Sequence, residues 1–342
     1  MPVLDSILET IGNTPLVRLT RIPQEEGARA TVLAKLESFN PSGSLKDRIY
    51  REMIARAQER GDLKKGMEII EASTGNAGIA CCFVGRAMGY AVTIVMPAGM
   101  SDERKKLISA YGGRLVLTPG GESDVDLCLE KVQELLAKEP RRFWFPNQFA
   151  NKDNPAAHFN TTGPEIWKQT RGRIDAFVAS QGSGGTLTGV GRFLKRHRRS
   201  IRLYAVEPAE APAISEGRWG SHRIEGIGDG FIPRNLDLSL LDGVVRVASE
   251  EAIEMTRRLL AEEGIFCGIS SGCNVAAALK VARSHPEYGT IVTTINDSGN
   301  RYFSTEVFGA RKLVAIPDRE HLLDPYSRSQ IEKYGPRFEL LD

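Results

Sequence analysis

The sequence lacks the features that mark several large classes of protein. No stretch approaches the roughly 18 consecutive apolar residues of a membrane-spanning helix, so we expect no membrane partner. The formal net charge is only +2, which argues against a chain built around nucleic acid. Residues 1–19 contain no basic segment followed by an apolar run, so no export signal is predicted.

Cysteine and histidine are also scarce, with five of each. Neither residue type follows the spacing of a zinc site or a disulfide framework, and we expect no metal site. We interpret all five cysteines as reduced, buried thiols of a cytoplasmic protein. They are Cys81, Cys82, Cys128, Cys267 and Cys273.

What the sequence does contain is typical of an enzyme-sized globular chain. It has 342 residues, of which 41% are hydrophobic and 26% are charged, enough for about two domains. Apolar, β-branched runs alternate with longer segments of helical period, a pattern that predicts βαβ units and parallel sheet. The expected strands are 31–37, 67–72, 91–96, 114–118, 174–179, 201–206, 243–248 and 290–295. The expected helices are 45–60, 77–88, 101–110, 123–138, 187–199, 249–263 and 272–284.

A segment rich in Pro, Asn and Gly, residues 146–164, has no clear period and is interpreted as a boundary between domains. We expect a smaller α/β domain over 41–150. A larger α/β domain is expected over 1–40 plus 151–310, followed by a C-terminal tail over 311–342. The tail is charged and aromatic, with weak periodicity.

Two glycine-rich turns follow predicted strands and open predicted helices. In the first, Gly182, Gly184 and Gly185 allow the backbone to curl with its N–H groups pointing inward. The positive end of the helix dipole then favours a phosphate, and the hydroxyls of Ser183 and Thr186 are placed to contribute. The turn does not match GxxxxGK[ST] and fits the dinucleotide fingerprint poorly. A tight turn without a ligand is the alternative.

The second turn, Ser73-Thr74-Gly75-Asn76, opens an Ala/Gly-rich helix. Its hydroxyls and bare amides suit a carboxylate at a helix N-terminus, although an ordinary N-cap explains them as well. Lys46 lies nearby in the first turn of another predicted helix, where a cation is electrostatically unfavourable. Partial burial there would lower its pKa, as a Schiff-base amine requires.

Together these residues resemble fold-type II enzymes that use pyridoxal 5′-phosphate (PLP), above all the cysteine synthase (O-acetylserine sulfhydrylase) and cystathionine β-synthase family. The resemblance covers about residues 8 to 308, and eight motifs occur in the family's order. They are IGNTPLVRL at 11–19, PSGSLKDR at 41–48, EASTGNAGIA at 71–80, NQFANKDNP at 147–155, GSGGTLTGV at 182–190, EGIGDGFIP at 225–233, EEGIFCGISSG at 262–272 and NDSGNRYFST at 296–305. The implied fold is α/β, with two open, twisted, largely parallel sheets, flanking helices and PLP in the cleft between domains.

The resemblance also implies a role for each matching residue. Lys46 would bind PLP as a Schiff base and later move the α-proton, Asn76 would hydrogen-bond its 3′-oxygen, and Ser270 would meet its pyridine nitrogen. The cofactor's phosphate would lie on Gly182, Ser183, Gly184, Gly185 and Thr186. The substrate-binding positions implied are Ser73, Thr74, Gly75, Gln148, Gly226 and Ile227.

The implied activity is β-replacement on a serine-type amino acid through an aminoacrylate intermediate. Cysteine synthesis from O-acetylserine or O-phosphoserine and sulfide is the first expectation. The alternatives are a cystathionine β-synthase-like condensation of serine with homocysteine, a serine/threonine dehydratase or racemase, and a non-enzymatic binding module. The expected partners are the amino acid, a thiol or sulfide and, as is usual in the family, a second copy of the chain in a homodimer.

Three departures from the family pattern bear on the substrate. Ala77 lacks the hydroxyl that the family usually places beside the carboxylate. Glu225 is closer to the cystathionine β-synthase pattern than to the glutamine of most cysteine synthases. Asp229 adds an acid near the expected mouth of the cleft, either to meet an amino group or as a solvated loop charge.

Overall fold

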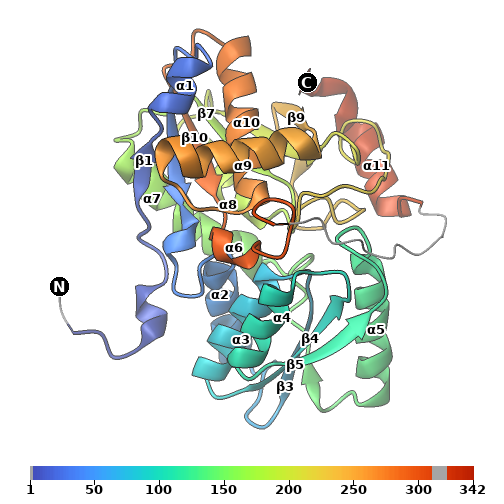
Figure 1. The fold of residues 1–342 in the computed structure, drawn as a ribbon. Helices are drawn as coiled ribbons and strands as arrows, with labels where there is room; N and C mark the ends of the chain where they lie inside the picture. The colour runs from blue at the N-terminus through green and yellow to red at the C-terminus, as the bar shows by residue number, and fades with distance from the viewer. Residues whose placement is uncertain (1–2, 310–321) are drawn as a thin grey trace.

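The chain folds around two mostly parallel β-sheets, one above the other in Figure 1. The computed structural model describes residues 3–309 and 322–342. The larger sheet has the strand order β1-β2-β10-β7-β8-β9-β11 and the smaller sheet β5-β4-β3-β6. The strands of the larger sheet are β1 (Leu16–Arg18), β2 (Thr31–Leu36), β7 (Ala176–Ser180), β8 (Arg202–Pro208), β9 (Gly243–Val247), β10 (Thr290–Ile295) and β11 (Glu339–Leu341). Those of the smaller sheet are β3 (Glu68–Ala72), β4 (Ala91–Pro97), β5 (Arg114–Thr118) and β6 (Phe143–Trp144).

All eight predicted strands occur, each with ends within two residues of the prediction. They are buried apolar runs, which parallel sheets covered on both faces produce. The three strands that the sequence did not reveal, β1, β6 and β11, have three, two and three residues. Such short strands carry too little alternation to be detected. Among the described strands, only β1 pairs antiparallel, with Leu16 opposite Lys35.

Helices cover both sheets (Figure 1). They are α1 (Arg21–Glu25), α2 (Lys46–Arg60), α3 (Asn76–Ala87), α4 (Asp102–Ala110), α5 (Val125–Lys138), α6 (Asp153–Asn160), α7 (Thr162–Gln169), α8 (Gly185–His197), α9 (Ser249–Glu263), α10 (Ile269–Ser284) and α11 (Pro325–Tyr334). The seven predicted helices all occur. No described helix is long and apolar enough to cross a lipid bilayer.

Segment 146–164 is more ordered than its composition predicts, because it contains α6 and the start of α7. Pro155 lies in the first turn of α6, where a missing N–H is tolerated. Gly163 lets α7 approach α8, since a Cβ there would lie 2.7 Å from Phe193. The lack of a clear period in this segment therefore does not mean a lack of helix, because these Pro and Gly residues serve helix starts and close packing.

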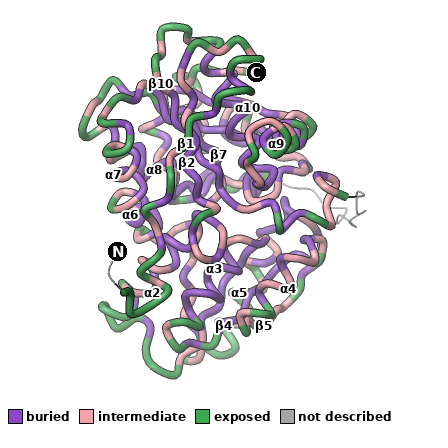
Figure 2. Tube along the Cα trace, turned by 60° about the vertical axis from the view of Figure 1, so that its left-hand side comes forward, coloured by how far each residue is buried: buried purple, intermediate pink, exposed green. Residues whose placement is uncertain are grey.

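Apolar side chains fill the space between sheets and helices, and Figure 2 shows burial throughout the interior of both parts. Helix α10 is buried along most of its length, with Ala276, Ala277 and Ala278 allowing close packing against α9 and β10. All five cysteines are buried and unpaired, as predicted. Part of the expected tail, residues 322–342, supplies α11 and β11, which pairs with β9; residues 311–321 lie outside the described structure.

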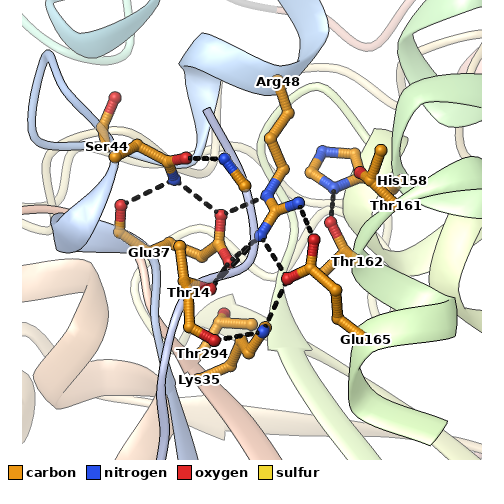
Figure 3. A network of polar contacts seen from close by, with 12 residues as sticks. Thr14, Lys35, Glu37, Ser44, Arg48, His158, Thr161, Thr162, Glu165 and Thr294 are labelled. Carbon is orange, nitrogen blue, oxygen red and sulfur yellow. Dashed lines mark hydrogen bonds and ion pairs between the residues drawn. The ribbon is translucent and has the colours of Figure 1, made fainter. Parts of the chain in front are cut away.

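A buried ionic network fixes the start of α2 against the larger sheet (Figure 3). The Arg48 guanidinium contacts Glu37 and Glu165, each at 2.7 Å, and Lys35 contacts Glu165 at 2.7 Å. Burial opposes ionisation of Glu165, but hydrogen bonds and the charges of Arg48 and Lys35 lower its pKa to about 2. The network therefore links β2, α2 and α7 close to Lys46, which is two residues before Arg48.

Candidate active site

The carboxyl ends of β3, β7 and β10 lead into loops that meet between the two sheets, as ligand sites in open α/β sheets do. These loops line a cavity of about 50 Å³. Twelve of the predicted site residues line it: Lys46, Ser73, Thr74, Asn76, Gln148, Gly182, Ser183, Gly184, Thr186, Gly226, Ile227 and Ser270. Gly75 and Gly185 lie within the same loops but do not line the cavity.

Lys46 is the first residue of α2, and its amine faces this cavity. The preceding turn is held to the loop after β10 by backbone hydrogen bonds, Leu45 N to Asn296 O at 3.0 Å and Ser298 N to Gly43 O at 3.1 Å. Burial lowers the pKa of Lys46, while the charges of Asp229, Asp297 and Glu122 act in the opposite direction. The result is an amine that deprotonates more readily than a surface lysine.

Opposite Lys46, the turn after β7 forms a cradle at the N-terminus of α8. Gly184 is its N-cap with φ of +78°, a left-handed conformation that favours glycine. A Cβ at Gly182 would lie 2.8 Å from the carbonyl oxygen of Gly226, and one at Gly185 would overlap the Asn154 side chain. Backbone N–H groups and a helix dipole without an acidic residue in the first turn make this cradle suitable for an anion.

The side chains of the turn after β3 form hydrogen bonds within the protein. The Ser73 hydroxyl caps α3 by accepting hydrogen bonds from the amides of Gly75 at 3.0 Å and Gly78 at 2.7 Å. The Thr74 hydroxyl donates to Glu122 at 2.8 Å, and the Gln148 amide donates to the Ala72 carbonyl at 3.2 Å. The N-terminus of α3, a 12-residue helix, is therefore the part of this turn that can bind a carboxylate.

Asn76 is held by an acid that the sequence analysis assigned no role. Its Nδ2 donates to Asp297 Oδ2 at 2.7 Å, and the Tyr302 hydroxyl donates to the same oxygen at 2.7 Å. Oδ1 of Asn76 is buried without a hydrogen-bond partner. A buried, unpartnered amide oxygen fits a ligand that brings a donor. The sequence signal for Asp297 was its place in the NDSGN motif, directly after β10.

Ser270 lies in the first turn of α10 and accepts a hydrogen bond from Asn296 Nδ2 at 3.1 Å. It is 3% exposed and lines the cavity. A serine here presents a neutral group to whatever ring occupies the cavity. Like Asp297, Asn296 is a residue of this site to which the sequence analysis assigned no role.

Two further acids belong to the cleft. Asp229 lines the cavity and is 6% exposed, so the interpretation as a solvated loop charge was wrong. Glu122, in the turn between β5 and α5, was not singled out from sequence at all. It accepts hydrogen bonds from Thr74 and from the Gly226 amide, both at 2.8 Å, and so joins the loops of the two sheets. The sequence signal for Glu122 was its place in the Gly-rich turn after β5.

Comparison with known proteins agrees with this geometry. Residues 7–297 match the family model described as pyridoxal-phosphate dependent enzyme. Cysteine synthase A of Escherichia coli (strain K12) is 47% identical over 308 residues, which cover 87% of this chain and 94% of that protein. The chain belongs to the cysteine synthase family of pyridoxal-phosphate-dependent enzymes.

Solved structures of the family have the same fold. Cysteine synthase from Entamoeba histolytica superposes with a TM-score of 0.86 at 36% identity, covering 99% of this chain and 97% of that one. O-ureido-L-serine synthase gives a TM-score of 0.84 at 43% identity, covering 90% and 96%. The predicted fold class, two largely parallel sheets of a fold-type II PLP enzyme, is confirmed.

The residues around the cavity fit PLP. The cradle at the start of α8 suits its phosphate, because side chains at Gly182 or Gly185 would clash with their neighbours. The buried Oδ1 of Asn76 has no partner within the described protein. The Lys46 amine, with its lowered pKa, is of the kind that condenses with an aldehyde.

Proposed function

We propose that the protein is a cysteine synthase, which replaces the β-substituent of O-acetylserine or O-phosphoserine with sulfide. The observation that carries the proposal is the Lys46 amine in one cavity with an anion cradle at α8 and a second helix N-terminus at α3. The names of the relatives from Escherichia coli and Entamoeba histolytica support it. We also propose that the protein is cytoplasmic and acts as a homodimer.

The assignments of individual residues belong to this proposal. Lys46 would hold PLP covalently, the 182–186 turn would hold its phosphate, and Asn76 and Ser270 would contact its ring. When bound, PLP supplies an electron sink for bond breaking at the α-carbon of an amino acid. Ser270, being neutral, does not favour a protonated ring nitrogen as a carboxylate would.

The chain's own groups would then perform three tasks. The amides at the start of α3 would hold the substrate's α-carboxylate, with Gly75 keeping the turn open: a Cβ there would overlap the Arg104 side chain. The amine of Lys46 would accept the proton of the α-carbon as general base, because burial lowers its pKa and so favours the unprotonated form more than in a surface lysine. Gly226 and Ile227 would cover the substrate and exclude water.

We propose that residues 41–150 form one domain and residues 1–40 plus 151–310 the main part of the other. Three polar contacts between them support closure of the cleft around substrate. These are Asn76 with Asp297, Glu122 with the Gly226 amide, and the ion pair of Arg104 with Glu225. The glutamate at 225 keeps a cystathionine β-synthase-like condensation as the second candidate.

The test is the visible absorbance of the purified protein with O-acetylserine, O-phosphoserine and serine added in turn. A band of protein-bound PLP that changes with one donor, followed by cysteine formation on adding sulfide, is the expected result. Lys46→Ala should abolish both the covalent PLP band and turnover. A protein that cannot be loaded with PLP, or a Lys46→Ala variant with normal turnover, would overturn the proposal. Product formed only with homocysteine would favour the second candidate.

A further inference from the structure

The C-terminal segment 322–342 lies beyond residues 7–297, which match the family model, and the proposed mechanism gives it no task. Its helix α11 packs through Ile331 and Tyr334 on the connection that leads from β8 to β9 (Figure 1). That connection, residues 209–242, includes Gly226, Ile227 and Asp229, which line the cavity. The C-terminal segment therefore contacts the same connection that supplies one wall of the candidate active site.

One buried hydroxyl joins α11 to this connection. Ser327 is fully buried, and its Oγ accepts a hydrogen bond from the Ile232 amide at 2.9 Å. The same hydroxyl donates to Asp324 Oδ2 at 2.5 Å, while Oδ1 of Asp324 caps α11 by accepting from the amides of Tyr326 and Ser327. The proton of Ser327 is thus directed to Asp324, which leaves its lone pairs for Ile232.

The loop before Ile232 forms few hydrogen bonds through its backbone. Of the N–H groups of residues 229–234, that of Ile232 is the one with a hydrogen bond to another segment of the described chain. Gly226, Gly228 and Gly230 have φ values of +94°, +67° and +85°. Glycine reaches such values easily and has the greatest conformational freedom once it is released. The Ser327 hydrogen bond is therefore a main restraint on this loop.

The chain after Ile232 is held without α11. Asn235 donates through Nδ2 to the Gln148 carbonyl at 2.8 Å, and its own carbonyl accepts from Thr188 Oγ1 at 2.7 Å. These contacts keep that part of the connection on α8, close to the phosphate cradle. Loss of the Ser327 hydroxyl should therefore act on residues 226–231 and leave the cradle in place.

We propose that Ser327 is a positioning residue of the active site, through which α11 holds residues 226–231 closed over the bound amino acid. This inference rests on the proposed function, in which Gly226 and Ile227 cover the substrate. A loosened cover leaves Lys46 and the cofactor's site unchanged but lets the amino acid leave more readily. It therefore weakens substrate binding without slowing the chemical step.

The kinetic test is stopped-flow absorbance of the PLP-loaded protein mixed with O-acetylserine in the absence of sulfide. In Ser327→Ala the buried Ile232 amide loses its acceptor, so the O-acetylserine concentration for half-maximal rate should rise about tenfold while the maximal rate changes less than about twofold. The absorbance before mixing and the affinity for PLP should equal those of the wild type.

Ser329→Ala is the matched control. It makes the same change two residues later on α11, where the hydroxyl is exposed and donates to the Tyr326 carbonyl. It should keep the wild-type concentration dependence. An unchanged half-maximal concentration in Ser327→Ala, or an equal loss of maximal rate and PLP affinity, would overturn the proposal.

Hydrogen exchange follows the cover without turnover. In the PLP-loaded protein, amides of residues 226–232 should exchange about tenfold faster in Ser327→Ala than in the wild type, while those of 182–186 stay unchanged. Asp324→Ala removes the partner of the Ser327 hydroxyl from an exposed position. It should therefore fold even if Ser327→Ala does not, and should change exchange in the same direction by a smaller factor.

The two measurements separate this inference from the proposed function. Faster exchange at 226–232 in the variants, in a protein that makes no cysteine, would support the role of Ser327 as an anchor and overturn cysteine synthesis. Wild-type exchange in both variants together with normal cysteine synthesis would overturn the inference alone.

Discussion

Arg48 and Glu37 form an ion pair that is closed to solvent: Nε lies 2.7 Å from Oε2, and both side chains are 1% exposed. Burial opposes ionisation of Glu37, and the Arg48 charge overcomes it, so the pKa of Glu37 is lowered. The same guanidinium binds Glu165 on α7. Because Arg48 is two residues from Lys46, this pair sets the position of the helix start that carries the proposed catalytic amine.

Replacing Arg48 by methionine should leave Glu37 buried and unpaired, which destabilises a protein by about 3–5 kcal/mol. We expect the thermal midpoint to fall by roughly 4–7 °C for a chain of this size. Arg56→Met is the matched control, since Arg56 pairs with Glu52 and Glu59 on the exposed face of the same helix, where ion pairs contribute little to stability. Equal midpoints for the two variants would contradict the importance of the buried network.

The cradle at α8 should not tolerate a side chain at Gly185. A Cβ there would overlap Asn154, whose Nδ2 also binds the Ser183 hydroxyl at 3.0 Å. Gly185→Ala should therefore displace the 182–186 turn and weaken PLP binding at least about tenfold, the loss expected when an anion's amide donors move out of place. Fluorescence titration of the apoprotein with PLP measures this. Gly289→Ala, at a surface turn where a Cβ has space, should bind PLP as the wild type does.

Much of this architecture could be predicted from the sequence because it depends on local patterns. Buried parallel strands such as 176–179 are apolar runs, and turns such as 182–185 show their glycines directly. The helices in segment 146–164 were missed because Pro155 and Gly163 resemble loop residues until their neighbours are known. The short strands β1 and β11 are defined by their pairing partners, which a single segment does not reveal.

The acids of the cleft were harder to predict for a different reason. Asp297, Glu122 and Asp229 lie in three separate loops, and their environment arises only when β5, β8 and β10 bring those loops together. A carboxylate in a loop is solvated in most proteins. Its burial, and hence its effect on Lys46, depends on contacts between residues more than 70 positions apart, such as Asn76 with Asp297.

Asn76→Ala and Ser270→Ala should both retain PLP, because neither contributes to the phosphate cradle or to Lys46. Loss of Asn76 also leaves the Asp297 carboxylate with one fewer donor. We expect a shifted absorbance band of bound PLP in each variant and a slower reaction with the amino-acid donor. Stopped-flow spectra with O-acetylserine measure both effects. Wild-type spectra and rates in both variants would refute the assignment of these two residues to the cofactor's ring.

Glu71 makes the stability of the protein depend on pH in a predictable direction. It is fully buried on β3, accepts hydrogen bonds from the Tyr50 hydroxyl at 3.1 Å and from the amides of Ala72 and Gln148, and burial raises its pKa to about 8. The folded state therefore keeps a proton that the unfolded chain, with a pKa of 4.5, has released. The stability that this group contributes is complete below about pH 4.5 and is lost as the pH rises to about 8.

Glu71→Gln removes this titration. The free energy of unfolding of the wild type, minus that of the variant, should therefore decrease by about 1 kcal/mol per pH unit between about pH 5 and 8. Above about pH 8 this difference should stay constant. Urea unfolding of both PLP-loaded proteins at half-unit pH steps measures the difference. Burial lowers the pKa values of His158 and His222, but both are present in the two proteins and cancel. Glu130→Gln, at an exposed position, should parallel the wild type. A constant difference between wild type and Glu71→Gln would mean that Glu71 is already ionised in the folded protein.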